Sequence, residues 1–208
     1  MFYQTKRDIE FLRDLYNVKY INSNRVHRLF GNYKSSMRRL KQLRDENLIH
    51  VIDYLNDRQF VYMVSKKYCI SINQPCEGFT KTDKLLHYLA ICDYYFYMKD
   101  QIKNIYFEKV YKFSEGTFRP DLVVETLTGK WLLVEIDLCN RRFEQKVATW
   151  ESFYLSQAFK LHFPKFPPII IVTTNITKVK ADIEKAQKIK LNYIYKDLKE
   201  IENWKYKY

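Results

Sequence analysis

The strongest constraint on the fold of this chain is a pair of strand patterns joined by a short glycine-containing turn. Residues 119–126 and 130–138 are rich in apolar and β-branched side chains, and Leu127-Thr128-Gly129 separates them. A three-residue hairpin loop requires a left-handed residue, and glycine adopts that conformation without strain. The loop pairs residue 126 with residue 130, which sets Asp121 across from Glu135, whereas a pairing shifted by one residue sends Asp121 to the opposite face. We therefore predict an antiparallel hairpin in the first register.

The hairpin presents acidic side chains in a pattern that suits a metal site. Side chains alternate along a strand, so Glu135 and Asp137 share one face, and we expect their apolar neighbours to fill the core from the other. Three adjacent carboxylates repel one another unless a cation lies among them, and Mg²⁺ or Mn²⁺ prefers such oxygen ligands. Lys146, on the helix expected next, could stabilise charge on a phosphate group. We predict Asp121, Glu135 and Asp137 as metal ligands and, with Lys146, as catalytic residues; the alternative is a solvated row of charges.

The first third of the chain shows three helical patterns followed by two strand patterns. Thr5, with Asp8 three residues later, is a helix start signal, and Asn22 or Ser23 is another. Gly31-Asn32 separates the second and third helices, which gives a helix-turn-helix pattern. We expect helices from Thr5, from residues 22–23 to 30 and from 33 to 47, then strands at 48–54 and 59–64. Three helices and a β-hairpin form the winged-helix arrangement, with the third helix as the recognition helix.

The basic charge of the chain concentrates on the same segment. The formal net charge is +12, and residues 1–67 hold 14 Lys or Arg against 7 Asp or Glu. A basic folded surface attracts polyanions, so we predict that this unit binds double-stranded DNA. The alternative is a protein-interaction module with solvated cations. The predicted DNA-binding residues lie on the outward face of the third helix and at the tip of the hairpin: Tyr33, Lys34, Ser35, Ser36, Arg38, Arg39, Lys41, Gln42 and Arg58.

The remainder of the chain predicts a second, mixed α/β domain. Residues 68–80 show no clear period and contain Pro75 and Gly78, which indicates a linker. We place a winged helix-turn-helix domain at 1–68 and an α/β (α+β) domain at 79–202. The expected elements of this second domain are a helix from 80 or 82 to 100, strands at 105–113, 119–126 and 130–138, a helix at 140–160, a strand at 168–173, a helix at 177–189 and a strand at 192–195.

Several classes of protein are disfavoured by composition. The four cysteines form no Cys-x-x-Cys pair and no zinc-finger spacing with histidine. With four glycines, the chain lacks the glycine-rich loops of nucleotide-binding proteins, so we expect no cofactor other than the metal ion. No apolar stretch approaches the 18 residues of a membrane span, and the N-terminus lacks an apolar signal region. We expect a cytoplasmic protein without a membrane partner.

The acidic motifs resemble those of a known superfamily. Pro120-Asp121 followed by Glu135-Ile136-Asp137 is similar to the core of the PD-(D/E)xK, or restriction-endonuclease-like, superfamily. The resemblance implies metal binding at Asp121 and Glu135. The third position is normally lysine but is Asp137 here, and some members carry the lysine on the following helix, where Lys146 lies.

The full arrangement also resembles the replication-relaxation family of plasmids and other mobile elements, which joins a winged helix to such a domain. The similar motifs are Arg119-Pro120-Asp121 and the acidic-x-Asp segment at 135–137, although that segment commonly continues with Arg-Gly-Thr and here continues with Leu138-Cys139-Asn140. This resemblance implies a DNA-binding role in replication or mobilisation, with replication or relaxase proteins as partners. The alternatives are a divalent-metal-dependent DNA endonuclease and a winged-helix transcriptional regulator that forms a homodimer through residues 80–100.

Overall fold

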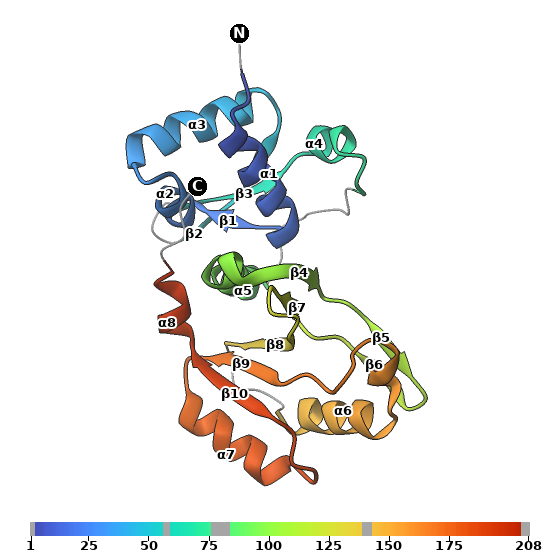
Figure 1. Cartoon of the computed structure of the whole chain (residues 1–208). Coiled ribbons are helices and arrows are strands. Elements are labelled where there is room, and N and C mark those ends of the chain that lie inside the picture. The colour runs from blue at the N-terminus through green and yellow to red at the C-terminus, as the bar shows by residue number, and fades with distance from the viewer. Residues whose placement is uncertain (1–2, 56–58, 76–83, 139–142, 205–208) are drawn as a thin grey trace. The chain divides into compact units, whose positions relative to one another are not determined.

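The computed structural model describes residues 3–55, 59–75, 84–138 and 143–204 (Figure 1). It is a mixed α/β structure whose contacts divide the chain into two units. One unit comprises the residues up to Tyr97 together with Trp204, and the other comprises Met98–Asn203. No helix within the described ranges is both long and apolar enough to cross a membrane.

The first unit contains three helices, a short strand between the first two, and then a β-hairpin, as the sequence patterns predict apart from the short strand. These elements are α1 (Lys6–Val18), β1 (Ile21–Asn22), α2 (Ser23–Phe30), α3 (Tyr33–Asp45), β2 (Ile49–Leu55) and β3 (Gln59–Val64). The strands form one antiparallel sheet in the order β1-β3-β2. Two further helices follow, α4 (Lys66–Ser71) and α5 (Leu85–Met98). Helix α4 overlaps the start of the segment 68–80, which was predicted to be a linker.

The helix ends of the first unit use the predicted caps. Thr5 and Asp8 form a capping box at the start of α1, and Asn22 accepts a hydrogen bond from the Arg25 backbone amide at the start of α2. Gly31 ends α2 in the left-handed region with φ of 74°, where a side chain would be strained. These local interactions fix where α2 stops and α3 begins.

Helix α5 belongs to the first unit, although the sequence analysis placed it at the start of the second domain. The Asp93 carboxylate accepts hydrogen bonds from Arg25 Nε at 2.8 Å and from Trp204 Nε1 at 2.8 Å. The Tyr95 hydroxyl donates to Asp14 at 2.6 Å. Because Arg25 and Asp14 lie on α2 and α1, these polar contacts tie α5 to the N-terminal helices. The expected boundary at 69–78 therefore differs from the observed one after Tyr97.

The second unit is built around a five-stranded sheet in the order β10-β9-β8-β7-β4. The pairs β4–β7 and β7–β8 are antiparallel, whereas the pairs β8–β9 and β9–β10 are parallel. The elements are β4 (Ile102–Phe107), β5 (Tyr111–Phe113), β6 (Gly116–Phe118), β7 (Leu122–Thr126), β8 (Trp131–Asp137), α6 (Phe143–Leu155), β9 (Ile169–Thr173), α7 (Ile176–Ala186), β10 (Tyr193–Asp197) and α8 (Leu198–Glu202), with short 3-10 turns at Lys99–Gln101 and Ala158–Leu161.

Three details of the second unit differ from the sequence analysis. The strand expected at 105–113 is two strands, β4 and β5, and β5 pairs with β6 in a separate small hairpin. The short helix α8 was not anticipated. The expected start of the helix at residue 140 lies outside the described residues, which resume at the first residue of α6.

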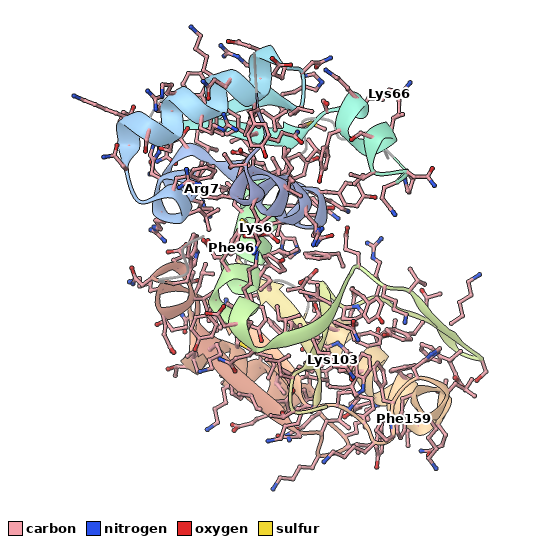
Figure 2. All side chains as sticks on the ribbon, turned by 45° about the horizontal axis from the view of Figure 1, so that its top comes forward. Lys6, Arg7, Lys66, Phe96, Lys103 and Phe159 are labelled. Atoms are coloured by element: carbon pink, nitrogen blue, oxygen red, sulfur yellow. The ribbon has the colours of Figure 1, made fainter. Side chains whose placement is uncertain are left out.

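Many aromatic side chains of the chain fill the core of the second unit. Tyr111 packs against Phe153 and Phe163 with ring centroids 5.5 Å apart in each pair. Phe159, labelled in Figure 2, stacks on Tyr154 at 5.8 Å. These rings come from a strand, a helix and the segment before β9, so aromatic packing closes one side of this unit.

Both faces of β8 are buried, which corrects the expectation of a less buried acidic face. Leu133 shares its face with Glu135, and it packs in the core with Val147 and Trp150 of α6. On the opposite face, Val134 is also fully buried. A strand in the middle of a mixed sheet is covered on both sides, so Glu135 enters the core beneath α6 instead of facing solvent.

Candidate functional site

The β7–β8 hairpin has the predicted register. Leu122 lies opposite Val134 and Glu125 lies opposite Trp131, so position 121 falls opposite Glu135. At the turn, the Thr126 backbone amide donates to the Lys130 carbonyl oxygen at 2.8 Å, and Gly129 has φ of 75°. The three-residue loop and its left-handed glycine therefore place two carboxylates side by side, as the sequence indicates.

Asp121 is fixed by the backbone of the neighbouring strand. Its Oδ2 accepts a hydrogen bond from the Ile136 amide at 2.7 Å. Residue 121 precedes the first residue of β7, so the side chain supplies the acceptor at the point where the backbone ladder ends. This contact holds the Asp121 carboxylate next to the C-terminal end of β8.

Glu135 and Lys146 form an ion pair within this cluster, in which the carboxylate is buried and the lysine side chain is partly exposed. Lys146 Nζ lies 2.9 Å from Glu135 Oε2, and the Glu135 side chain is only 6 % exposed. The pKa of Glu135 is raised to about 7, because burial and the charge of Asp121 raise it more than Lys146 and a hydrogen bond from the Trp150 side chain lower it. A carboxyl group with a pKa near neutrality is characteristic of functional sites.

Lys146 remains a cation in this environment. Burial alone lowers its pKa, but the neighbouring carboxylates of Glu135, Asp121 and Asp137 outweigh that effect, so the net pKa of Lys146 is raised. The structure thus brings together Asp121, Glu135 and Lys146, with Asp137 within electrostatic reach of the ammonium group. Asp137 is buried on β8 opposite Thr173 of β9.

The three carboxylates predicted as metal ligands all lie within electrostatic reach of the Lys146 ammonium group. Within the described ranges, no three or more His, Cys, Asp or Glu side chains converge so that they could hold a metal ion. The cation beside Glu135 is the ammonium group of Lys146, which supplies the positive charge that buried carboxylates require.

Helix α3 presents most of the predicted DNA-binding residues to solvent. Tyr33 is 65 % exposed, and Lys34, Arg38, Lys41 and Gln42 are exposed as well. Ser35 is half-buried, and its side chain hydroxyl donates to the Asn32 carbonyl oxygen at 3.1 Å. Arg58 lies outside the described residues. The outward face of α3 therefore combines cations with an aromatic ring.

Ser36 and Arg39 point into the fold, contrary to the sequence analysis. The buried Ser36 hydroxyl donates to the Tyr33 carbonyl oxygen at 2.8 Å, so it accepts its hydrogen bond from Nδ1 of His27. Arg39 Nε donates to Asp8 Oδ1 at 2.7 Å, and Nη2 donates to the Tyr3 carbonyl oxygen at 2.7 Å. The interaction with buried Asp8 holds α3 against the start of α1, and Arg39 is therefore a structural residue.

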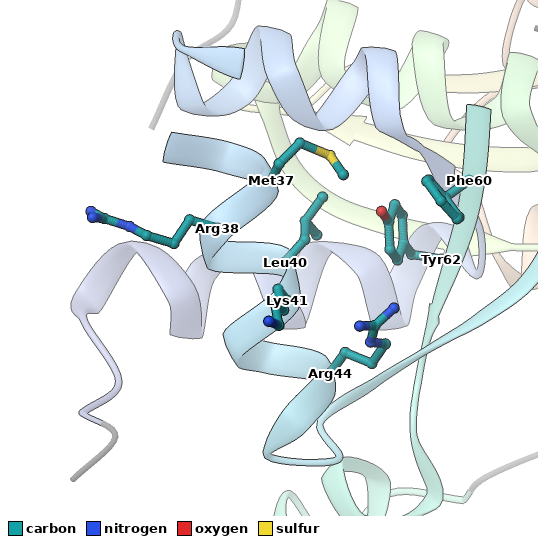
Figure 3. A pocket seen from close by; sticks show the side chains of 7 residues that line it. All are labelled: Met37, Arg38, Leu40, Lys41, Arg44, Phe60 and Tyr62. Atoms are coloured by element: carbon teal, nitrogen blue, oxygen red, sulfur yellow. The ribbon is translucent and has the colours of Figure 1, made fainter. Parts of the chain in front are cut away.

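A pocket between α3 and β3 was missed by the sequence analysis. Its volume is about 400 Å³, and its apolar lining consists of Met37, Leu40, Phe60 and Tyr62. Arg38, Lys41 and Arg44 supply its cations. Figure 3 shows Phe60 and Tyr62 projecting from β3 toward α3, and Met37 and Leu40 facing them. Two features of the sequence could have indicated this pocket. The aromatic residues Phe60 and Tyr62 alternate along β3, and three cations are spaced three residues apart along α3.

Comparison of the chain with protein-family models, with curated proteins and with solved structures gives no match.

Proposed function

We propose that this chain is a double-stranded DNA-binding protein that uses α3 as its recognition helix. The observation that carries the proposal is the composition of α3, which has five basic residues and one acidic residue, with its exposed cations on one outward face. Cationic side chains that displace condensed counterions from the phosphates supply most of the affinity of such proteins. The exposed Tyr33 and Gln42 add hydrogen-bonding groups that could contact base edges.

The topology of the first unit supports a winged-helix assignment. Helices α1, α2 and α3 precede the β2–β3 hairpin, and β1 completes a small sheet by pairing with β3. In this assignment the hairpin is the wing, and α3 enters the major groove. The Asp8–Arg39 contact would fix the angle of α3 against α1.

The test is DNA binding measured as a function of salt. Fluorescence anisotropy of a labelled duplex would be recorded for the wild type, for Arg38→Ala with Lys41→Ala, and for Lys66→Ala, which removes an exposed cation of α4. Each lost phosphate contact lowers the slope of log K against log salt by about 0.9, so we expect the double variant to lower it by about 2. An unchanged slope in the double variant, or an equal loss in Lys66→Ala, would refute recognition by α3.

For the second unit we propose a restriction-endonuclease-like domain that serves replication or mobilisation of a mobile element without cutting DNA. Support comes from the pairing of Asp121 with Glu135 across the hairpin and from the approach of Lys146 from the following helix. Asp137 stands where that superfamily normally has lysine. The ammonium group of Lys146 is already engaged by Glu135. This favours a domain that binds DNA or replication proteins without cutting.

A second candidate function is DNA cleavage that depends on Mg²⁺ or Mn²⁺, and one observation favours it. The carboxyl group of Glu135 has a pKa of about 7, which suits a general base at neutral pH. Supercoiled plasmid would be incubated with each metal ion and with the wild type, Asp121→Ala or Glu135→Gln. We expect no nicking by any of the three proteins. Nicking by the wild type that both variants abolish would establish the enzyme instead.

A further inference from the structure

The pocket between α3 and β3 has the shape and chemistry of a ligand site. Its volume of about 400 Å³ lies within the range of about 300–1,000 Å³ found for small-molecule sites. Leu40 and Tyr62, which are 2 % and 3 % exposed, form a floor held by the core of the unit. Phe60 is only partly buried and forms a wall on the β3 side. The apolar part of the pocket therefore suits a flat ring that can stack on an aromatic side chain.

The charges around this pocket select an anionic partner. Arg38, Lys41 and Arg44 are exposed, and no acidic side chain is among the described residues that line the pocket. Their spacing of three residues along α3 spreads them over about 9 Å of helix axis. In Figure 3 the Arg38 side chain extends away from the two aromatic rings. One small anion seated on the rings could not contact all three cations, whereas a chain of phosphates could.

We infer that the pocket accepts an unpaired base of a DNA strand, stacked against Phe60, while the phosphates of that strand lie along Arg38, Lys41 and Arg44. This inference rests on the proposed DNA-binding function and specifies its substrate, which is duplex DNA that carries an unpaired nucleotide. Stacking on aromatic rings is sequence-tolerant because every base has a flat face. A row of cations beside such a ring is the combination that proteins use to bind unpaired strands.

The experiment compares two DNA substrates that differ by one unpaired nucleotide. Affinities would be measured by anisotropy at equal salt for a fully paired duplex and for the same duplex with a single extra thymine in one strand. The proteins are the wild type, Phe60→Leu, Met37→Trp and the control Tyr106→Leu. Leucine at position 60 keeps an apolar side chain but removes the stacking ring, and tryptophan at position 37 fills the pocket from α3. Tyr106 is an exposed aromatic residue of β4 in the second unit.

We expect the wild type and Tyr106→Leu to bind the duplex with the unpaired thymine about fivefold or more tighter than the paired duplex, as one stacked base would give. Phe60→Leu and Met37→Trp should lose that preference and keep their affinity for the paired duplex. Circular dichroism melting curves would confirm that these variants fold.

Three results would overturn the inference, and they separate it from the proposed function. Equal affinity of the wild type for both substrates would rule out the site for an unpaired base but would not contradict the proposed binding of duplex DNA. A preference that persists in both pocket variants would place the site elsewhere. Thymidine monophosphate that displaces both substrates equally would identify a small-molecule site. By contrast, the absence of binding to either DNA at low salt would refute the proposed function itself.

Discussion

The buried carboxyl group of Glu135 predicts a specific pH dependence for the stability of the second unit. Burial raises its pKa to about 7 from an ordinary value of 4.5. The folded state then binds a proton more tightly than the unfolded state, so this group favours folding most below about pH 4.5 and progressively less as the pH rises through about 7. The two pKa values differ by about 2.5, and at 1.36 kcal/mol per pH unit this corresponds to about 3 kcal/mol.

The variant Glu135→Gln tests this reasoning because glutamine cannot ionise. Urea unfolding would be followed by the fluorescence of Trp131 and Trp150, which both lie in the second unit. We expect the free energy of unfolding of the variant, relative to the wild type, to increase by about 3 kcal/mol between about pH 4.5 and about pH 8. The same substitution at the exposed Glu115 measures the effect of removing a surface carboxylate and is subtracted. A difference that stays constant within about 1 kcal/mol over this range would refute a raised pKa at Glu135.

Three further outcomes follow from the same contacts. Lys146→Met should move the midpoint of that pH profile upward in the same urea experiment, because Lys146 lowers the pKa of Glu135. Arg39→Ala should lower the stability of the first unit by about 3–5 kcal/mol in chemical denaturation, because Asp8 stays buried without its cation, and a smaller loss in Asp8→Ala with Arg39→Ala would support this cause. Gly129→Ala should cost about 1 kcal/mol in thermal melting, since φ is 75° and no atom crowds the site.

The parts of the fold that the sequence predicts are those determined by neighbouring residues. The capping box of Thr5 and Asp8, the stop at Gly31 and the turn at Gly129 each depend on interactions within a few residues. Loop length and turn type set the register of a hairpin, so the position of Asp121 opposite Glu135 could also be predicted.

The parts that the sequence could not predict depend on contacts between distant segments. Alternation along β8 separates two sets of side chains but does not say which set faces α6, because both faces of a central strand are buried. Arg39 looks like an outward cation on the helical pattern, and only the approach of Asp8 from α1 turns it inward. The assignment of α5 to the first unit similarly depends on Asp93 and its remote partner Arg25.

The double use of Asp8 has a practical consequence for anyone who dissects this protein into fragments. One carboxylate both closes the first turn of α1, through the hydroxyl and amide of Thr5, and neutralises Arg39 on α3. A fragment that begins just after Asp8 would lose the cap of α1 and also the carboxylate that binds Arg39. Helix α1 would then fray, and α3 would lose its contact with α1. Expression fragments of the first unit should therefore keep Tyr3, whose carbonyl oxygen also binds Arg39, and any affinity tag is better placed ahead of it.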